Sequence, residues 1–295
     1  MALRRRGEME PYLRRSLALL WLLLGLGWGS SAWAATEPPG ESLVFGIYPY
    51  LSPSEIVTYF SPLADYLQQQ LGREVELRSA PDFNAFIDRT RGGDYDLIFT
   101  APHLGRLAQK QSAFQPLAQS GWRIEVLVVT RKEGALQQLD DLKHHSLAIG
   151  AKLSMTYQLV NHALALRGLQ LEREVEFIQT ASFSNVIEAV VRGEADAGAT
   201  GTILWQRAPE AQRAALKEIY RSESVPGFLL LSHPRLGEAR YRQLRQALLS
   251  FATSAAGQRY FSTTGQIDFR PLDEETMRSL DPFTGVLRLF KALPH

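Results

Sequence analysis

Strand and helix signals alternate along this chain from Ser42 onward, and that alternation limits the fold more than any other feature. The apolar run Leu43–Ile47 predicts a strand. Apolar residues then recur every three or four positions over Ser54–Leu71, which predicts an amphipathic helix with one buried face. Gly72 follows as a typical helix stop. Repeated units of this kind favour open, mostly parallel sheets covered by helices.

The same pattern continues through the rest of the chain. Further strands are predicted at 74–78, 95–99, 125–130, 146–149, 174–178, 195–199 and 225–231. Further helices are predicted at 82–91, 102–110, 154–167, 182–192, 238–251 and 254–261, with short helical turns at 139–142 and within 272–293.

Two predicted strands, 125–130 and 225–231, are long and apolar and bracket the second set of units. A chain that leaves one lobe, builds another and returns needs two crossing segments, and we expect these strands to supply them. One lobe is therefore predicted to be discontinuous, comprising 42–128 and 226–295, and the other to comprise 129–225. With 295 residues, of which 45% are hydrophobic, the chain is long enough to build two cores.

The N-terminus has the features of a cleaved secretory signal over residues 1–34. Arg14 and Arg15 precede the apolar run Leu17–Trp28, and Ala32-Trp33-Ala34 matches a signal-peptidase site. The alternative is a retained membrane anchor, but a spanning helix needs ~20 apolar residues and this run has about 12. Residues 35–41 then form a short linker, and translation could start at Met1 or at Met9.

Composition excludes several classes of protein. The chain has no cysteine, which rules out a lipid anchor on an N-terminal cysteine, a disulfide framework, thiolate metal sites and a cysteine nucleophile. Its formal net charge of +1 gives no argument for nucleic-acid binding. No Gly-x-Ser-x-Gly elbow, Walker loop, His-Glu-x-x-His motif or dinucleotide fingerprint is present, and the histidines lack metal-ligand spacing. We expect a protein that is not an enzyme and has neither cofactor nor metal.

The residues that follow the predicted strands are the candidates for binding, because ligands of open α/β sheets lie outside the carboxyl ends of the strands. Hydroxyl-bearing, aromatic and glycine residues predominate there, without a carboxylate. The predicted ligand contacts are Tyr48, Tyr50, Thr100, His103, Ser154, Met155, Thr156, Phe183 and Thr200.

Such a set suits an anion or an oxygen-rich group, which backbone N–H groups at a helix N-terminus and side-chain hydroxyls can hold. Ser154 and Thr156 are the sharpest candidates because they open a helix directly after a strand. Two alternatives stay open. Ser154 and Thr156 are equally suited to ordinary helix capping, and Phe183 continues an apolar stripe that would place it in the core.

Several short segments, in order, carry a resemblance to a known family. They are Phe45-Gly46-Ile47-Tyr48-Pro49, the stretch 60–67 with Leu71-Gly72 after it, the stretch 93–102, the stretch 148–154, the stretch 189–198, and Phe269-Arg270-Pro271-Leu272-Asp273. The mature chain resembles the substrate-binding proteins of phosphate, phosphite and phosphonate ABC importers, the PhnD-like group. The resemblance implies a type II-like periplasmic-binding-protein fold: two α/β lobes, each an open mixed sheet with helices on both faces, joined by two crossing strands.

The resemblance also implies where a ligand would bind. In such proteins a phosphorus oxyanion lies at the N-terminus of the helix that here begins at Ser154, with aromatic contacts from the loops at Tyr48 and His103. This sequence has His103 where tyrosine is usual and Phe183 where histidine is usual. It also lacks acidic residues in 200–205 and 226–228, so a ligand ammonium group would have no partner and aminoethylphosphonate is not expected.

The sequence thus predicts a monomeric periplasmic protein that closes around a small molecule and delivers it to an ABC permease. The resemblance implies that this molecule is an oxyanion such as a phosphonate-like compound. A different oxyanion or a more apolar ligand would suit the altered pocket. The alternative is a ligand-sensing component that presents its closed form to a membrane receptor or histidine kinase. The sequence does not separate these two roles.

Overall fold

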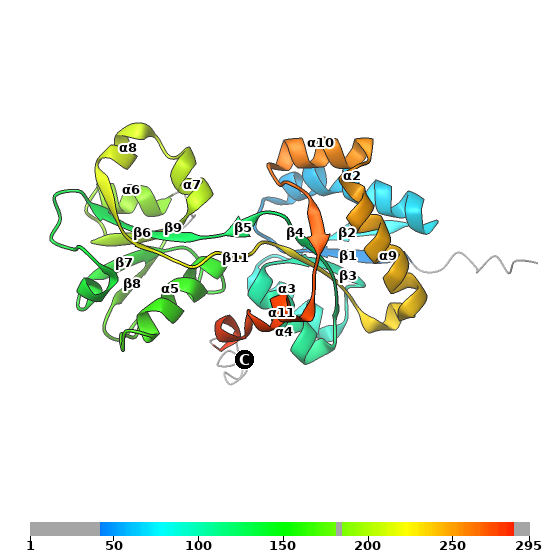
Figure 1. Cartoon of the computed structure of the whole chain (residues 1–295), viewed down its shortest axis with the longest axis horizontal. Helices are drawn as coiled ribbons and strands as arrows, with labels where there is room; N and C mark the ends of the chain where they lie inside the picture. The colour runs from blue at the N-terminus through cyan, green and yellow to red at the C-terminus, as the bar shows by residue number, and fades with distance from the viewer. Residues whose placement is uncertain (1–41, 181–184, 286–295) are drawn as a thin grey trace, which may run out of the picture. The chain divides into compact units, whose positions relative to one another are not determined.

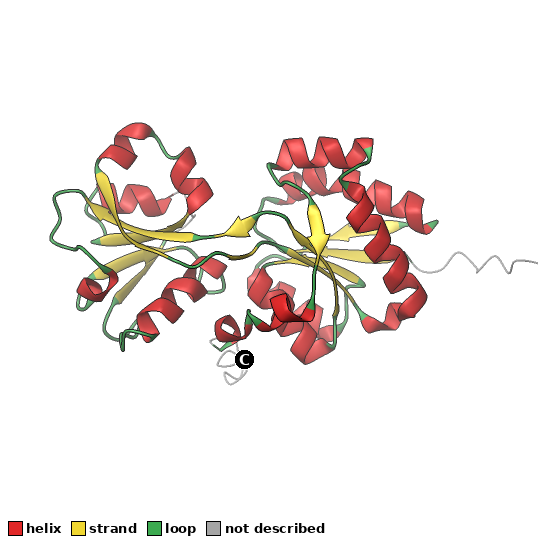
Figure 2. Ribbon diagram, in the orientation of Figure 1, coloured by secondary structure: helices red, strands yellow, loops and turns green. Residues whose placement is uncertain are grey.

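The computed structural model describes residues 42–180 and 185–285, which form two mixed sheets with helices on both faces (Figures 1 and 2). The predicted signal peptide 1–34 and linker 35–41 lie outside the described residues. Within the described part of the chain, no helix is long and apolar enough to span a membrane.

The first sheet has the order β13-β4-β12-β3-β1-β2. Its strands are β1 (Leu43–Ile47), β2 (Val75–Arg78), β3 (Leu97–Thr100), β4 (Gln115–Ser120), β12 (Leu229–Ser232) and β13 (Phe269–Pro271). The helices of this lobe are α2 (Pro53–Leu71), α3 (Phe83–Gly92), α4 (Pro102–Ser112), α9 (Gly237–Phe251) and α10 (Ala255–Thr264), with the 3-10 turn η2 (Pro234–Leu236).

The second sheet has the order β10-β6-β9-β7-β8. Its strands are β6 (Val126–Arg131), β7 (Ser146–Ile149), β8 (Glu176–Gln179), β9 (Ala197–Gly201) and β10 (Leu216–Arg221). The helices of this lobe are α5 (Met155–Ala165), α6 (Asn185–Val191), α7 (Thr202–Arg207) and α8 (Glu210–Ala214), with the 3-10 turn η1 (Leu139–Leu142).

Strand direction corrects the expectation of mostly parallel sheets. β1 pairs in parallel with β2 and β3, and β7 pairs in parallel with β8 and β9. β12 is antiparallel to both of its neighbours, and so is β6. These two strands follow the crossing segments, so they enter a sheet at the end where its parallel strands finish and must run the opposite way. The expected mixed sheets with helices on both faces are confirmed.

The crossing segments are shorter than predicted. The predicted strand 225–231 divides into β11 (Val225–Pro226) and β12, and the predicted strand 125–130 lies within the second sheet as β6. The segments that cross are β5 (Arg123–Ile124) and β11, which form an antiparallel pair outside both sheets (Figure 1). The break at Gly227 was missed because the apolar run was followed through Pro226-Gly227, a dipeptide that typically marks a turn.

Local signals explain the elements that were predicted correctly. Ser52 and Glu55 form a capping box at the start of α2, and Gly72 ends it with a φ of 60°. The predicted apolar stripe of α2 is buried, and Phe60 packs edge-on against Phe99 of β3 with ring centroids 4.9 Å apart. Elements β4, β10, β13, α7 and α8 were not predicted, since their short sequences mix polar and apolar residues without a clear period.

The C-terminal elements α11 (Glu274–Arg278) and η3 (Asp281–Thr284) are the short helices expected in the tail. η3 contacts both α4 and α5. Asp281 makes two hydrogen bonds to the Arg106 guanidinium of α4, at 2.9 and 3.0 Å, and Phe283 lies edge-on to His162 of α5 with ring centroids 5.3 Å apart. This segment therefore joins α4 of the first lobe to α5 of the second.

Candidate functional site

The N-terminus of α5 presents free backbone donors. The Ser154 hydroxyl accepts a hydrogen bond from the Tyr157 N–H at 3.2 Å, and the Ser154 carbonyl accepts from the Gln158 N–H at 3.2 Å. Ser154 therefore acts as the N-cap. The N–H groups of Met155 and Thr156 have no acceptor among the described residues. Two donors at a helix N-terminus form a natural site for an anion.

The loop that precedes α5 is held by side chains of its own lobe. Gln158, which is buried, donates through Nε2 to the Lys152 carbonyl at 2.8 Å. The Lys152 ammonium pairs with Glu172 at 2.6 Å, and the Tyr157 hydroxyl donates to the same carboxylate at 2.7 Å. These contacts fix the orientation of the loop carbonyls and of the helix start. Lys152 lies in the loop after β7 but was not among the predicted contacts, and Tyr157, Gln158 and Glu172 lie too far from a strand end for the strand-end rule to find them.

Two predicted residues of the first lobe reach the carbonyl of Leu153, the residue before the N-cap. His103, in the first turn of α4, lies with Nε2 3.0 Å from this oxygen. Tyr48, directly after β1, donates its hydroxyl to the same oxygen at a longer 3.5 Å. Groups from the carboxyl ends of strands in both sheets therefore meet at one loop, as the strand-end rule predicts.

The protonation of His103 follows from its surroundings. The ring is fully buried, and burial lowers its pKa to about 4, with the Leu153 hydrogen bond opposing part of that shift. The imidazole is therefore neutral near pH 7. A carbonyl oxygen can only accept, so Nε2 carries the hydrogen and Nδ1 carries a lone pair. That buried Nδ1 has no hydrogen-bond partner within 42–180 and 185–285.

An aromatic wall surrounds Tyr48. Its ring stacks on Phe83 at 4.5 Å and on Tyr50 at 6.3 Å, and Tyr50 in turn packs against Phe228 at 4.6 Å. Burial raises the pKa of the Tyr48 hydroxyl and of the Tyr50 hydroxyl well above their usual value, so both stay protonated. Phe228 follows the crossing strand β11, so the aromatic wall extends to a crossing segment. Sequence analysis did not identify Phe83 or Phe228 as part of this group.

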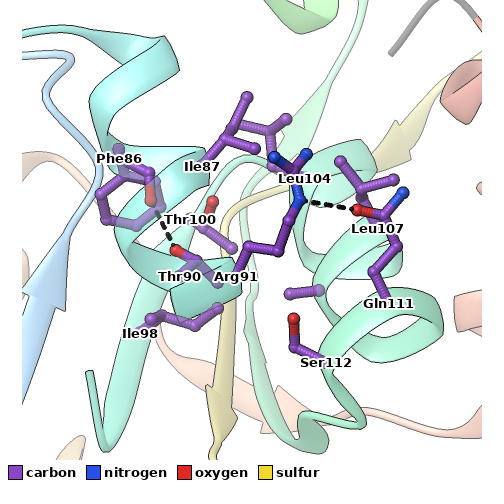
Figure 3. A pocket seen from close by; sticks show the side chains of 11 residues that line it. Phe86, Ile87, Thr90, Arg91, Ile98, Thr100, Leu104, Leu107, Gln111 and Ser112 are labelled. Atoms are coloured by element: carbon purple, nitrogen blue, oxygen red, sulfur yellow. Dashed lines mark hydrogen bonds between the residues drawn. The ribbon is translucent and has the colours of Figure 1, made fainter. Parts of the chain in front are cut away.

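Thr100 does not join this group. Its side chain lines a crevice between α3 and α4 together with Ile98 and Leu104, on the helix-covered face of β3 (Figure 3). Its hydroxyl has no partner among the described residues. The strand-end rule gave the right strand, but the side-chain alternation of β3 turns Thr100 toward these helices.

Thr200 and Phe183 complete the predicted set. Thr200 pairs with Leu127 in the ladder between β9 and β6, and its buried hydroxyl lacks a partner in the described part of the chain. Phe183 lies outside the described residues. Within those residues, no three His, Asp or Glu side chains are grouped to hold a metal ion. The site thus offers free backbone N–H donors, hydroxyls and one buried nitrogen acceptor.

Comparisons with known proteins match this architecture. A family model described as the periplasmic substrate-binding protein of a phosphonate ABC transporter matches residues 45–277. Among solved structures, XAC2383 from Xanthomonas citri bound to ATP is 22% identical, with a TM-score of 0.76 over 86% of this chain and 100% of that one.

Two further structures are also similar. PhnD1 from Prochlorococcus marinus in complex with methylphosphonate is 17% identical, with a TM-score of 0.70 over 84% of this chain and 98% of that one. The periplasmic aliphatic sulphonate binding protein SsuA from Escherichia coli is 14% identical, with a TM-score of 0.60 over 87% of this chain and 94% of that one. At these identities the structures establish the shared two-lobed fold.

Proposed function

The chain belongs to the family of periplasmic substrate-binding proteins of phosphonate ABC transporters, and from this premise we propose that it captures a small phosphorus oxyanion at the N-terminus of α5. The ligand would be bound between the two lobes and passed to an ABC permease. Binding without turnover fits the site, because the neutral His103 has no carboxylate partner among the described residues to make it a strong base.

The observation that carries this proposal is the meeting of His103 with the loop that opens α5. A helix N-terminus carries a partial positive charge of roughly half a unit, which favours an anion. The free N–H groups of Met155 and Thr156 would hold the oxyanion, and the Thr156 hydroxyl adds a third donor close by. Tyr48 and His103 would close the site from the other lobe.

We further propose that the lobes move about the β5–β11 pair. We keep the predicted division into a discontinuous first lobe, 42–128 with 226–295, and a continuous second lobe, 129–225, and change one boundary. The first boundary moves from residue 128 to the end of β5 at residue 124, because β6 pairs within the second sheet. A ligand that contacts both lobes would stabilise the closed form by its differential affinity for that form.

Family membership implies a periplasmic location, and we propose that a cleaved signal over residues 1–34 directs the chain there. Without cysteine, the mature N-terminus near Ala35 would carry no lipid anchor, and the protein would act as a monomer. N-terminal sequencing of the protein from a periplasmic extract tests this. A mature N-terminus close to Ala35 is expected, and an intact N-terminus in the membrane fraction would contradict it.

A thermal-shift screen of the mature protein tests the ligand class. The screen compares phosphate, phosphite, methylphosphonate, sulfate, alkyl sulfonates and small carboxylates. A ligand present at 100 times its Kd stabilises the folded state by ~2.7 kcal/mol, which corresponds to a rise in Tm of roughly 5–10 °C for a protein of this size. A rise with at least one phosphorus oxyanion is expected. If none of the phosphorus oxyanions raises the Tm, the proposed ligand class is wrong.

A further inference from the structure

We propose that the C-terminal strap, residues 273–285, is a releasable link between the lobes: it is anchored on α4 of the first lobe, and its Phe283 holds α5 of the second lobe in the closed form. The strap is thus a third connection beside the crossing segments β5 and β11. The inference rests on the proposed motion of the lobes about the β5–β11 pair. It goes beyond ligand binding, because it concerns how the ligand-free protein is distributed between open and closed forms.

Polar contacts fix the strap to the first lobe. The chain leaves the first sheet at the end of β13 and continues through α11 to η3, which contacts α4 (Figure 1). The buried Arg106 guanidinium of α4 donates to both carboxylate oxygens of Asp281, at 2.9 and 3.0 Å, and to Glu274 at 3.1 Å. The Lys110 ammonium also donates to Asp281, at 2.9 Å. Separation of the strap from α4 would leave a buried charge without its partners, which is costly, so the strap moves with the first lobe.

The contact of the strap with the second lobe is of a different kind. Phe283 is almost fully buried and lies edge-on to the His162 ring of α5, with ring centroids 5.3 Å apart and an interplanar angle of 79°. Among the described residues, η3 and α5 share no hydrogen bond or ion pair. This contact can therefore be lost and regained without leaving a polar group unpaired, unlike the contact with α4.

The position of the strap gives the direction of its effect. α4 and α5 meet at their first turns, where His103 contacts the Leu153 carbonyl, and the strap joins them further along, at Arg106 and His162. Opening would draw α5 away from α4 and expose the Phe283 ring to water. Burial of an aromatic ring should favour the closed form by roughly tenfold or more. A ligand that binds the closed form then meets a larger competent fraction, which strengthens its apparent affinity.

The distance between two spin labels, one on each lobe, tests the strap in the ligand-free mature protein. The chain has no cysteine, so Asn84→Cys on α3 and Leu166→Cys at the end of α5 supply two unique, exposed labelling sites. Double electron–electron resonance then gives the distribution of distances between the lobes. In Phe283→Ala, the ratio of open to closed populations should rise about tenfold and the distribution should move to longer distances.

Phe114→Ala is the matched control. Phe114 is also almost fully buried and lies edge-on to His233 with ring centroids 5.1 Å apart, but both residues belong to the first lobe. Its replacement should lower the Tm and leave the distances between the lobes unchanged. His162→Ala removes the contact from the α5 side while the strap keeps its anchor, and should lengthen the distances as Phe283→Ala does.

Two results would overturn the inference. One is an unchanged distribution in Phe283→Ala and His162→Ala, or in His162→Ala alone if Phe283→Ala does not fold. The other is an equal lengthening in Phe114→Ala, because general destabilisation would then explain the opening. These measurements need no ligand, so a thermal-shift screen in which no phosphorus oxyanion binds would refute the proposed ligand class and leave the strap standing.

Discussion

Replacement of Gly227 by alanine probes a close approach between the two crossing segments. A Cβ at this position would lie 2.2 Å from the Trp122 carbonyl oxygen, while real Cβ contacts below 3.0 Å are essentially never found. The two backbones would have to separate by at least 0.8 Å. Overpacking of this kind costs typically 1–3 kcal/mol, so the Tm should fall by roughly 4–8 °C for a cost near 2 kcal/mol.

Gly201→Ala supplies the matched control. Gly201 lies at the end of β9 in ordinary extended backbone, and a Cβ there would meet no atom closer than 4.0 Å. Both substitutions restrict the unfolded chain equally, which stabilises a protein by about 0.4–1 kcal/mol. The difference in Tm between the two variants, measured by circular dichroism, therefore isolates the overlap at Trp122. Equal melting temperatures would refute the argument that the crossing segments need glycine at 227.

Three further outcomes are expected. Thr156→Val should weaken methylphosphonate binding by about tenfold in titration calorimetry without lowering the Tm. Ser154→Ala should instead cost ~1 kcal/mol of stability, because it removes the cap of α5. Equal effects of the two substitutions on stability would contradict these roles. Asp281→Asn should lower the urea midpoint by the equivalent of about 1–2 kcal/mol, because the mostly buried Arg106 loses its bidentate partner. The partial exposure of Asp281 keeps this cost modest. An unchanged midpoint would contradict a stabilising role for this ion pair. Because the pKa of His103 is about 4 in the folded protein and near 6.5 in the unfolded chain, the unfolded chain binds the extra proton between these values, and stability should fall by up to ~3 kcal/mol as the pH drops through that window. His103→Phe should reduce this slope in Tm measured against pH, and equal slopes would show that other groups cause it.

Part of the site could be predicted from the sequence because the rule behind it is local. Tyr48, His103 and Ser154 each follow a recognisable strand, and the carboxyl ends of strands are where α/β sheets place their ligands. The structure brings these three to one loop through the Leu153 carbonyl. The same rule identifies the end of a strand but not the face on which its last side chain lies, and Thr100 lies on the helix-covered face of β3.

The sequence by itself determined the alternation of helices and strands, the buried stripe of α2 and its end at Gly72. These features depend on residues a few positions apart, so short-range periodicity and capping chemistry are enough to predict them. The absence of cysteine likewise excluded thiol chemistry without any structure.

Only the tertiary structure decided the direction of β6 and β12, the close approach of Gly227 to Trp122, and the contact of His103 with the Leu153 carbonyl. Each depends on groups that are distant along the chain: His103 meets a carbonyl 50 residues away, and Gly227 meets the backbone of Trp122. No local pattern encodes such contacts, because they arise only when the whole chain has paired its strands and excluded water from the space between them.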